Sequence, residues 1–233
     1  MKKKIEILMA AVLLIAAFLL ARNGAVIVES LRADPSDEGI CIVLDAGHGG
    51  RDGGKIGVNG AEEKDINLEI VMRLKRLLES EGIRVVLTRK DDNGLYQESS
   101  SNKKVEDMRN RCALIKEEMP VFTVSIHQNS YPEEYVKGAQ VFYYGKSAES
   151  KKLAEMIQAS MVERLDPENR RSAKANESYY LLKRTPTPTV IVECGFLSNS
   201  EEAALLTTEK YQEQVAWSIH MGIMQYLNQQ VKN

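Results

Sequence analysis

The chain has 233 residues, with 31 Lys and Arg against 33 Asp and Glu, and a formal net charge of -2 at pH 7. No basic block is interleaved with aromatic residues, so the composition argues against nucleic acid as a partner. The three cysteines, Cys41, Cys112 and Cys194, are too few and odd in number for a disulfide framework. The fold must therefore depend on its hydrophobic core.

The first 25 residues have the pattern of an export segment. A positive start of three lysines precedes an uncharged apolar run at residues 7–21. This run is shorter than the about 20 residues of a bilayer crossing and is more typical of the core of a signal sequence. The residues after it make a poor cleavage site, so cleavage, retention as an anchor and a short uncleaved terminal helix all stay open. We expect residues 1–25 to be a signal peptide or membrane anchor, residues 26–38 a linker, and residues 39–233 a single catalytic domain.

Short apolar runs alternate with helical patterns along this domain. Five strands are predicted, at residues 40–44, 83–88, 121–126, 138–144 and 189–192. Helices are predicted from the acidic residues 62–65 to just before Gly82, at residues 107–117 and 147–165, and from Glu201 and from Glu209, with a polar loop at residues 170–177. The alternation predicts an α/β fold: one mostly parallel or mixed twisted sheet with helices on both faces.

Ionisable side chains follow three of the predicted strands. His48 lies in the glycine-rich stretch after the first strand, His127 comes directly after the third, and Glu193 directly after the fifth. Ligands of open α/β sheets bind at the carboxyl ends of strands, so we expect these side chains to meet in one crevice. A carboxylate after an apolar strand is costly to bury unless it is paired or binds a metal.

This set is typical of a catalytic zinc site, which takes three protein ligands and leaves a fourth position open. Glu62 or Glu63 would complete the ligand set with the two histidines, and residue type alone does not choose between them. Glu193 would remain free to take a proton from the attacking water and return it to the leaving nitrogen. A simpler interpretation is that Glu62 and Glu63 favour a helix N-terminus and that Glu193 pairs with Arg184.

The remaining polar candidates are expected to have structural roles. His220 lies within a predicted helix with no motif around it and is expected to be structural. Asp45 and Asp52 are expected to support the ligands from behind or to form turns.

Five motifs occur in one order along the folded part of the chain. They are IVLDAGHGG at residues 42–50, EKDINL at 63–68, LTR at 87–89, SIHQN at 125–129 and VECGFLSN at 192–199. Together they resemble the zinc N-acetylmuramoyl-L-alanine amidases of bacterial cell-wall remodelling. Within this family the sequence is most similar to the germination-specific, spore-cortex branch. The features that indicate this branch are Asp107-Met108 with Arg111, the stretch LLKR at residues 181–184 and the absence of wall-binding repeats. Cys194 departs from the small or branched apolar residue usual after the catalytic glutamate.

The resemblance implies one Zn²⁺ per chain, held by His48, Glu63 and His127, with Glu193 as the catalytic residue. It therefore selects Glu63 rather than Glu62 as the third metal ligand. It also implies hydrolysis of the lactyl-to-L-alanine amide of peptidoglycan, on the cell-wall or cortex side of the membrane, with formation of muramic lactam in the cortex. A membrane tether through the N-terminus and an accessory activating protein stay open as further partners. Candidate substrate contacts are Asn129, Arg171 and Tyr179, and Asp45 is a candidate for supporting the ligands.

Three rival interpretations stay open on the residues alone. Cys194 with His127 could form a cysteine hydrolase, although strand alternation would point Cys194 and Glu193 to opposite faces. The domain could instead bind cell wall through a structural metal, but such sites are usually closed by four protein ligands. A zinc peptidase or deacetylase would use the same chemistry, and imidazole and carboxylate ligands do not select zinc alone.

Overall fold

The structure is a computed structural model that describes residues 39–230. The expected export segment and linker lie outside the described residues, and their boundaries stay predictions. Within residues 39–230, every helix is too short or too polar to cross a bilayer.

Six strands form one mixed sheet in the order β2-β1-β3-β6-β4-β5. Strands β2, β1, β3 and β6 are parallel, β4 is antiparallel to β6, and β5 is parallel to β4. Every residue of β1 and of β6 is buried, as expected for strands whose two faces are both covered. The strands are β1 (Cys41–Ala46), β2 (Arg84–Leu87), β3 (Phe122–Asn129), β4 (Gln140–Tyr143), β5 (Lys174–Ala175) and β6 (Thr189–Phe196).

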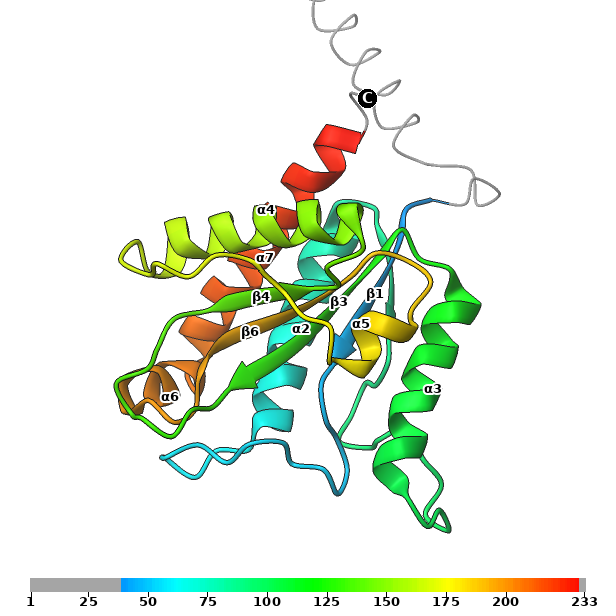
Figure 1. Cartoon of the computed structure of the whole chain (residues 1–233), viewed down its shortest axis with the longest axis horizontal. Helices are drawn as coiled ribbons and strands as arrows, with labels where there is room; N and C mark the ends of the chain where they lie inside the picture. The colour runs from blue at the N-terminus through cyan, green and yellow to red at the C-terminus, as the bar shows by residue number, and fades with distance from the viewer. Residues whose placement is uncertain (1–38, 231–233) are drawn as a thin grey trace, which may run out of the picture. The chain divides into compact units, whose positions relative to one another are not determined.

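Helices cover both faces of this sheet (Figure 1). One face packs against the long helices α2 (Glu63–Ser80), α4 (Ala148–Leu165) and α7 (Glu209–Gln230), and this layer contains the main core. The other face packs against α3 (Lys103–Glu118) and the short α5 (Tyr180–Arg184). A further short helix, α6 (Ser200–Leu206), follows β6. The predicted α/β fold with helices on both faces is confirmed.

Several element boundaries differ from the sequence prediction. Helix α3 begins four residues earlier than predicted, because the Asn102 side chain accepts a hydrogen bond from the backbone N–H of Val105 at 3.2 Å. The predicted loop at residues 170–177 contains the two-residue strand β5, and the five-residue helix α5 was not predicted. Both elements are too short to show a periodic pattern in the sequence.

Two strands continue beyond their apolar runs. Strand β3 extends to Asn129 and β6 extends to Phe196, and His127 is the register partner of Glu193 across the two strands. The expectation that these two residues come after their strands was therefore wrong. Backbone pairing between neighbouring strands extends into the polar residues, which hydrophobic patterning alone does not reveal.

The helix layer contains one close approach that we can test. Gly222 of α7 faces α4, and a Cβ atom at this position would lie 2.6 Å from the Cα atom of Ile157. Gly222→Ala should therefore lower the free energy of unfolding by about 1–3 kcal/mol, measured by urea denaturation. Helix propensity alone predicts the opposite, a gain of up to about 1 kcal/mol. Asn228→Ala, an exposed change on the same helix, should have an effect within about 0.5 kcal/mol.

Candidate metal centre and active site

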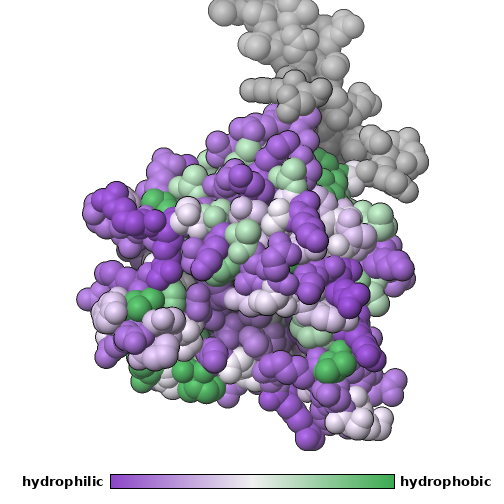
Figure 2. Space-filling model, viewed as in Figure 1, coloured by the Kyte–Doolittle hydropathy of each residue, from purple (hydrophilic) through white to green (hydrophobic). Residues whose placement is uncertain are grey.

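A cleft opens beside the carboxyl ends of β1, β3 and β6. Figure 2 shows this face as largely hydrophilic and hollowed next to α5. The lining of the cleft combines ionisable and apolar side chains. Its ionisable lining includes His48, Asp52, Lys104, His127 and Glu193, and its apolar lining includes Met108, Leu181 and Ile191.

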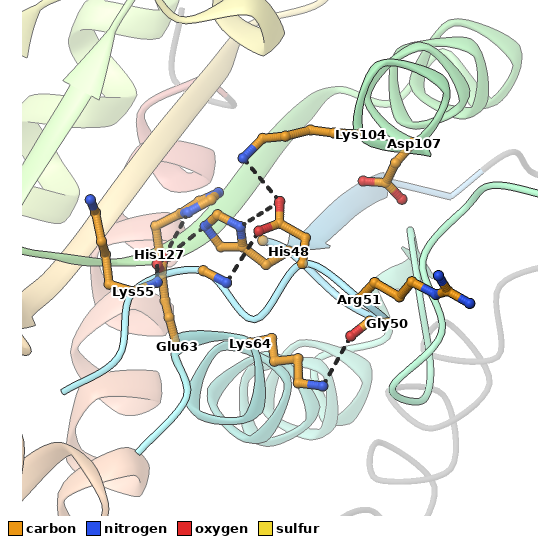
Figure 3. A network of polar contacts seen from close by, with 12 residues as sticks. His48, Gly50, Arg51, Lys55, Glu63, Lys64, Lys104, Asp107 and His127 are labelled. Atoms are coloured by element: carbon orange, nitrogen blue, oxygen red, sulfur yellow. Dashed lines mark hydrogen bonds and ion pairs between the residues drawn. The ribbon is translucent and has the colours of Figure 1, made fainter. Parts of the chain in front are cut away.

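Three side chains, those of His48, Glu63 and His127, converge beside this cleft (Figure 3). Nε2 of His48 lies 3.2 Å from Oε2 of Glu63, and Nδ1 of His127 lies 2.9 Å from Oε1 of Glu63. One donor atom from each of the three residues lies within 4.8 Å of the others. The structure therefore brings together all three predicted ligands, which lie at the end of β1, the start of α2 and within β3.

The donor set fits a zinc ion. Zinc bonds to imidazole nitrogen and carboxylate oxygen measure about 2.0–2.2 Å, so neighbouring donors of a tetrahedral site lie roughly 3.3–3.6 Å apart. The separations of 3.2 and 2.9 Å lie slightly below this range and run to different oxygens of Glu63, and one donor atom from each residue lies within 4.8 Å of the others. Two imidazoles and one carboxylate also leave a coordination position open, which is typical of catalytic rather than structural sites.

The electrostatics around the ligands favour a cation. Burial would raise the pKa of Glu63, but its hydrogen bonds to His127 and His48 outweigh burial and hold that pKa well below its usual range. Burial would lower the pKa of His48, but Asp52 and Glu63 raise it to about 9. The cluster thus stabilises positive charge between its donors, where a metal ion would take the place of the protons.

Supporting groups fix the orientation of two of the three candidate ligands. Oδ2 of Asp52 lies 3.1 Å from Nδ1 of His48, which directs the opposite ring nitrogen toward Glu63. The backbone N–H groups of Lys55 and Gln128 donate to the two oxygens of Glu63 at 2.8 and 3.0 Å. Sequence reasoning missed Lys55 and Gln128, because a backbone donor has no signature in residue type.

Two glycines leave space for the ligands. A Cβ atom at Gly47 would lie 2.3 Å from the His127 ring, and one at Gly54 would lie 2.5 Å from Oε2 of Glu63. Gly54 also has a positive φ of +72°, which favours glycine for a second reason. Side chains at these positions would displace the ligands themselves.

His48 has an unusual backbone conformation. Its φ of +64° lies in the left-handed region, which non-glycine residues rarely adopt. Arg111 of α3 holds this turn by donating to the carbonyls of His48 at 2.5 Å and Ala46 at 2.7 Å. Arg89 donates to the intervening carbonyl of Gly47 at 3.1 Å. Two buried guanidinium groups therefore fix the loop that presents the first ligand.

Asp45 supports this arrangement from the sheet. Its carboxylate accepts hydrogen bonds from Arg111 at 2.6 Å, Ser125 at 2.6 Å and Thr88 at 2.7 Å. Burial would raise its pKa, but Arg111 and Ser125 outweigh burial and lower it to about 2. Asp45 makes no direct hydrogen bond to a ligand side chain among the described residues, so its support for His48 passes through Arg111.

Glu193 is buried in the cleft and forms no ion pair with the described residues. It is 8% exposed, and its Oε2 atom has no hydrogen-bond partner among residues 39–230. Burial raises its pKa to about 7, although the charge of His127 opposes this. Arg184 was the suggested partner, but its guanidinium lies over the Tyr180 ring and forms no ion pair with Glu193 among the described residues. Glu193 thus has the environment of a general base or acid.

Cys194 lies on the opposite face of β6 from Glu193. Its side chain is 1% exposed within the main core, does not line the cleft, and burial raises the pKa of its thiol well above the usual range. A thiol that stays protonated and away from the cleft cannot serve as a nucleophile. The structure therefore contradicts the cysteine-hydrolase interpretation.

The three candidate substrate contacts occupy different places. Tyr179 lines the cleft with the histidines and Glu193. Asn129 accepts a hydrogen bond from the N–H of Ser130, and Arg171 lies against Phe196 with its guanidinium 4.8 Å from the ring centroid. Neither residue is part of the cleft lining. His220 is buried in α7 beside Trp217, consistent with a structural role.

Comparison with known proteins identifies the family. Residues 42–225 match the family model described as N-acetylmuramoyl-L-alanine amidase, which covers most of the chain. The chain belongs to this amidase family. It is 41% identical over 194 residues to the germination-specific N-acetylmuramoyl-L-alanine amidase of Bacillus subtilis, covering 82% of this chain and 81% of that protein. The predicted family is thus confirmed.

Solved amidase structures share the fold. The CwlD amidase of Clostridioides difficile, solved in complex with the GerS lipoprotein, is 43% identical with a TM-score of 0.79, covering 81% of this chain and 98% of that one. The amidase AmiC2 of Nostoc punctiforme is 32% identical with a TM-score of 0.71, covering 81% and 97% of the two chains. These similarities extend over the whole amidase domain.

The buried Asp45–Arg111 pair of this amidase gives a pH-dependent prediction. Because the folded-state pKa of Asp45 is lowered from 3.8 to about 2, its stabilisation is complete above about pH 4 and is lost as pH falls toward 2. Asp45→Asn should therefore lower the free energy of unfolding by on the order of 2–3 kcal/mol at neutral pH. This difference should shrink between pH 4 and 2, measured by urea denaturation.

Glu213→Gln provides the control, because Glu213 is an exposed carboxylate on α7. This change should alter stability by less than about 0.5 kcal/mol at every pH. A constant difference between wild type and Asp45→Asn down to pH 2 would show that the charge of Asp45 does not stabilise the fold.

Proposed function

We propose that this protein is a zinc-dependent N-acetylmuramoyl-L-alanine amidase that cleaves the amide between the lactyl group of N-acetylmuramic acid and L-alanine of the stem peptide. One observation supports this most strongly: His48, Glu63 and His127 converge on one point of a cleft that also contains the unpartnered carboxyl group of Glu193. Membership in the amidase family supplies the substrate class.

His48, Glu63 and His127 would hold one zinc ion. When bound, zinc would polarise the amide carbonyl as a Lewis acid and promote the ionisation of water. Asp52 holds the His48 ring in the orientation that presents Nε2, and the N–H groups of Lys55 and Gln128 hold the Glu63 carboxylate. These contacts would orient the His48 ring and the Glu63 carboxylate for binding the ion.

Glu193 would transfer the proton. As water attacks the carbonyl carbon, the carboxylate takes a proton from that water, and a carbon–oxygen bond forms. The carbon–nitrogen bond then breaks, and Glu193 returns the proton to the leaving nitrogen of L-alanine. A pKa near 7 suits both halves of this transfer, because the group can accept and release a proton at neutral pH.

The relatives support a proposed biological setting. A germination-specific amidase is among the most similar proteins, which supports a role in the spore cortex and muramic lactam formation. Peptidoglycan lies outside the cytoplasm, which supports export through residues 1–25. Because the CwlD amidase was solved with a lipoprotein, an accessory protein is a candidate partner of this chain as well.

Zinc binding can be tested ligand by ligand. The purified protein should contain one zinc per chain, and dialysis against a chelator should remove both the metal and the activity. His127→Ala should weaken zinc affinity by more than about 100-fold, because loss of a supporting partner alone commonly costs 10–100-fold. Elemental analysis of dialysed protein measures the metal content. His220→Ala is the matched control and should retain one zinc; if it loses zinc as well, the ligand assignment is wrong.

If Glu193 acts as the general base, replacing it should lower turnover without removing the metal. Glu193→Gln should retain zinc and lose about 10²–10⁴-fold in turnover, because a general base contributes this much. Mass spectrometry of digested peptidoglycan should detect free stem peptides with an L-alanine amino terminus from wild type only. Cys194→Ala should stay active, since that thiol points into the core. Release of acetate or of new reducing sugar ends by the wild type would contradict an amidase.

A further inference from the structure

Helix α3 presents one face to the cleft. Four of its residues recur at the spacing of one helical stripe and line the cleft: Lys104, Asp107, Met108 and Arg111. The stripe runs from the surface into the interior, because the side chain of Lys104 is 71% exposed and that of Arg111 is 1% exposed. Lys104 therefore lies at the mouth of the cleft, where an incoming substrate meets it first.

The ammonium group of Lys104 lies beside the candidate metal ligands. Its Nζ atom lies 3.2 Å from Oδ2 of Asp52, and the same oxygen lies 3.1 Å from Nδ1 of His48. Figure 3 shows the lysine side chain extending from α3 toward the His48 ring. Two successive polar contacts thus connect the lysine charge to the first candidate ligand. An amide held at the metal centre for cleavage would lie close to this charge.

Lys104 is also available to bind a ligand. Among the described residues, the cleft lining contains one lysine and one arginine. The arginine is already fully used, because all three guanidinium nitrogens of Arg111 donate hydrogen bonds within the protein. The lysine has three N–H donors and one ion pair among the described residues, with Asp52. An exposed ion pair adds little to stability, and Asp52 keeps His48 as a partner, so the ammonium can turn toward a substrate.

The charge of the proposed substrate lies on its peptide part. The lactyl carboxyl group of the glycan is joined in the amide that is cleaved, so it carries no charge before the reaction. The stem peptide, in contrast, has free carboxyl groups beyond L-alanine. A cation at the mouth of the cleft therefore suits the peptide part of the substrate rather than the glycan.

We propose that Lys104 is a substrate-binding residue that recognises a carboxylate of the stem peptide and selects peptides in which this group is free. This inference rests on the proposed amidase function and names the substrate group that the cleft reads. An ammonium donates a strong, charge-assisted hydrogen bond to a carboxylate. Amidation replaces the carboxylate with a neutral carboxamide, to which the same ammonium binds less tightly.

The chain offers a matched control on the same helix. Lys104→Gln removes the charge at the mouth of the cleft and retains a polar side chain. Lys116→Gln makes the same change at an exposed position of α3 that does not line the cleft. Lys104→Arg restores a cation at the first position. The three variants separate the charge in the cleft from the charge of the helix as a whole.

The experiment measures kcat and KM on two disaccharide-peptide fragments that differ only in whether the carboxyl groups of the peptide are free or converted to carboxamides. Wild type should have a KM roughly 10-fold lower for the free form, because hydrogen bonds to charged groups are the stronger ones. Lys104→Gln should raise this KM by roughly 10-fold and leave the KM for the amidated form within about two-fold. Its kcat should change by less than about two-fold, as expected when binding that is uniform along the reaction is lost.

The remaining variants and readouts exclude an indirect role. Lys116→Gln and Lys104→Arg should both retain the preference for the free form, and every variant should keep the zinc content and thermal midpoint of wild type. If Lys104 acted only by supporting Asp52 and His48, Lys104→Gln would instead lower kcat or zinc content, to the same extent with both fragments. That result, or equal KM values of wild type for the two fragments, would overturn the inference. A wild-type protein that cleaves neither fragment would overturn the proposed function itself.

Discussion

The guanidinium group of Arg111 is the buried cation on which the geometry of the candidate metal centre depends. It is 1% exposed and connects Asp45 of the sheet, Asp107 of its own helix and the carbonyl of His48. A buried charge is tolerable only when its hydrogen bonds are satisfied, so the turn at His48 and the two carboxylates must be in place together. This requirement stabilises a left-handed histidine that would otherwise be costly.

Two glutamates at this site have contrasting electrostatic environments. Glu63 lies between two imidazoles, which keep it ionised in spite of burial. Glu193, across the strand pair from His127, lacks such a partner, and burial dominates its protonation. Two glutamates in one cleft thus acquire different chemistry from their neighbours: one suits metal coordination and the other suits proton transfer.

Much of this could be predicted from the sequence. The apolar runs predicted the five main strands, and the motifs predicted which histidines and glutamates meet in one cleft. The two-residue strand β5 and the five-residue helix α5 could not be predicted, because their stability comes from contacts rather than from local patterning. Backbone donors such as Lys55 have no side-chain signature. Arg171 stays a candidate substrate contact; its guanidinium lies over the Phe196 ring, a position that the polar loop around it does not reveal in the sequence.

The order of the strands has a consequence for how the protein matures. His48, His127 and Glu193 lie far apart in the chain. His48 follows β1, His127 lies on β3 and Glu193 lies on β6, and these three strands are consecutive neighbours in the sheet. Contacts between distant segments form slowly, since the intervening loops must close first. The three candidate ligands, His48, Glu63 and His127, all precede β6 in the chain, so Glu193 is the last of the four residues to be synthesised.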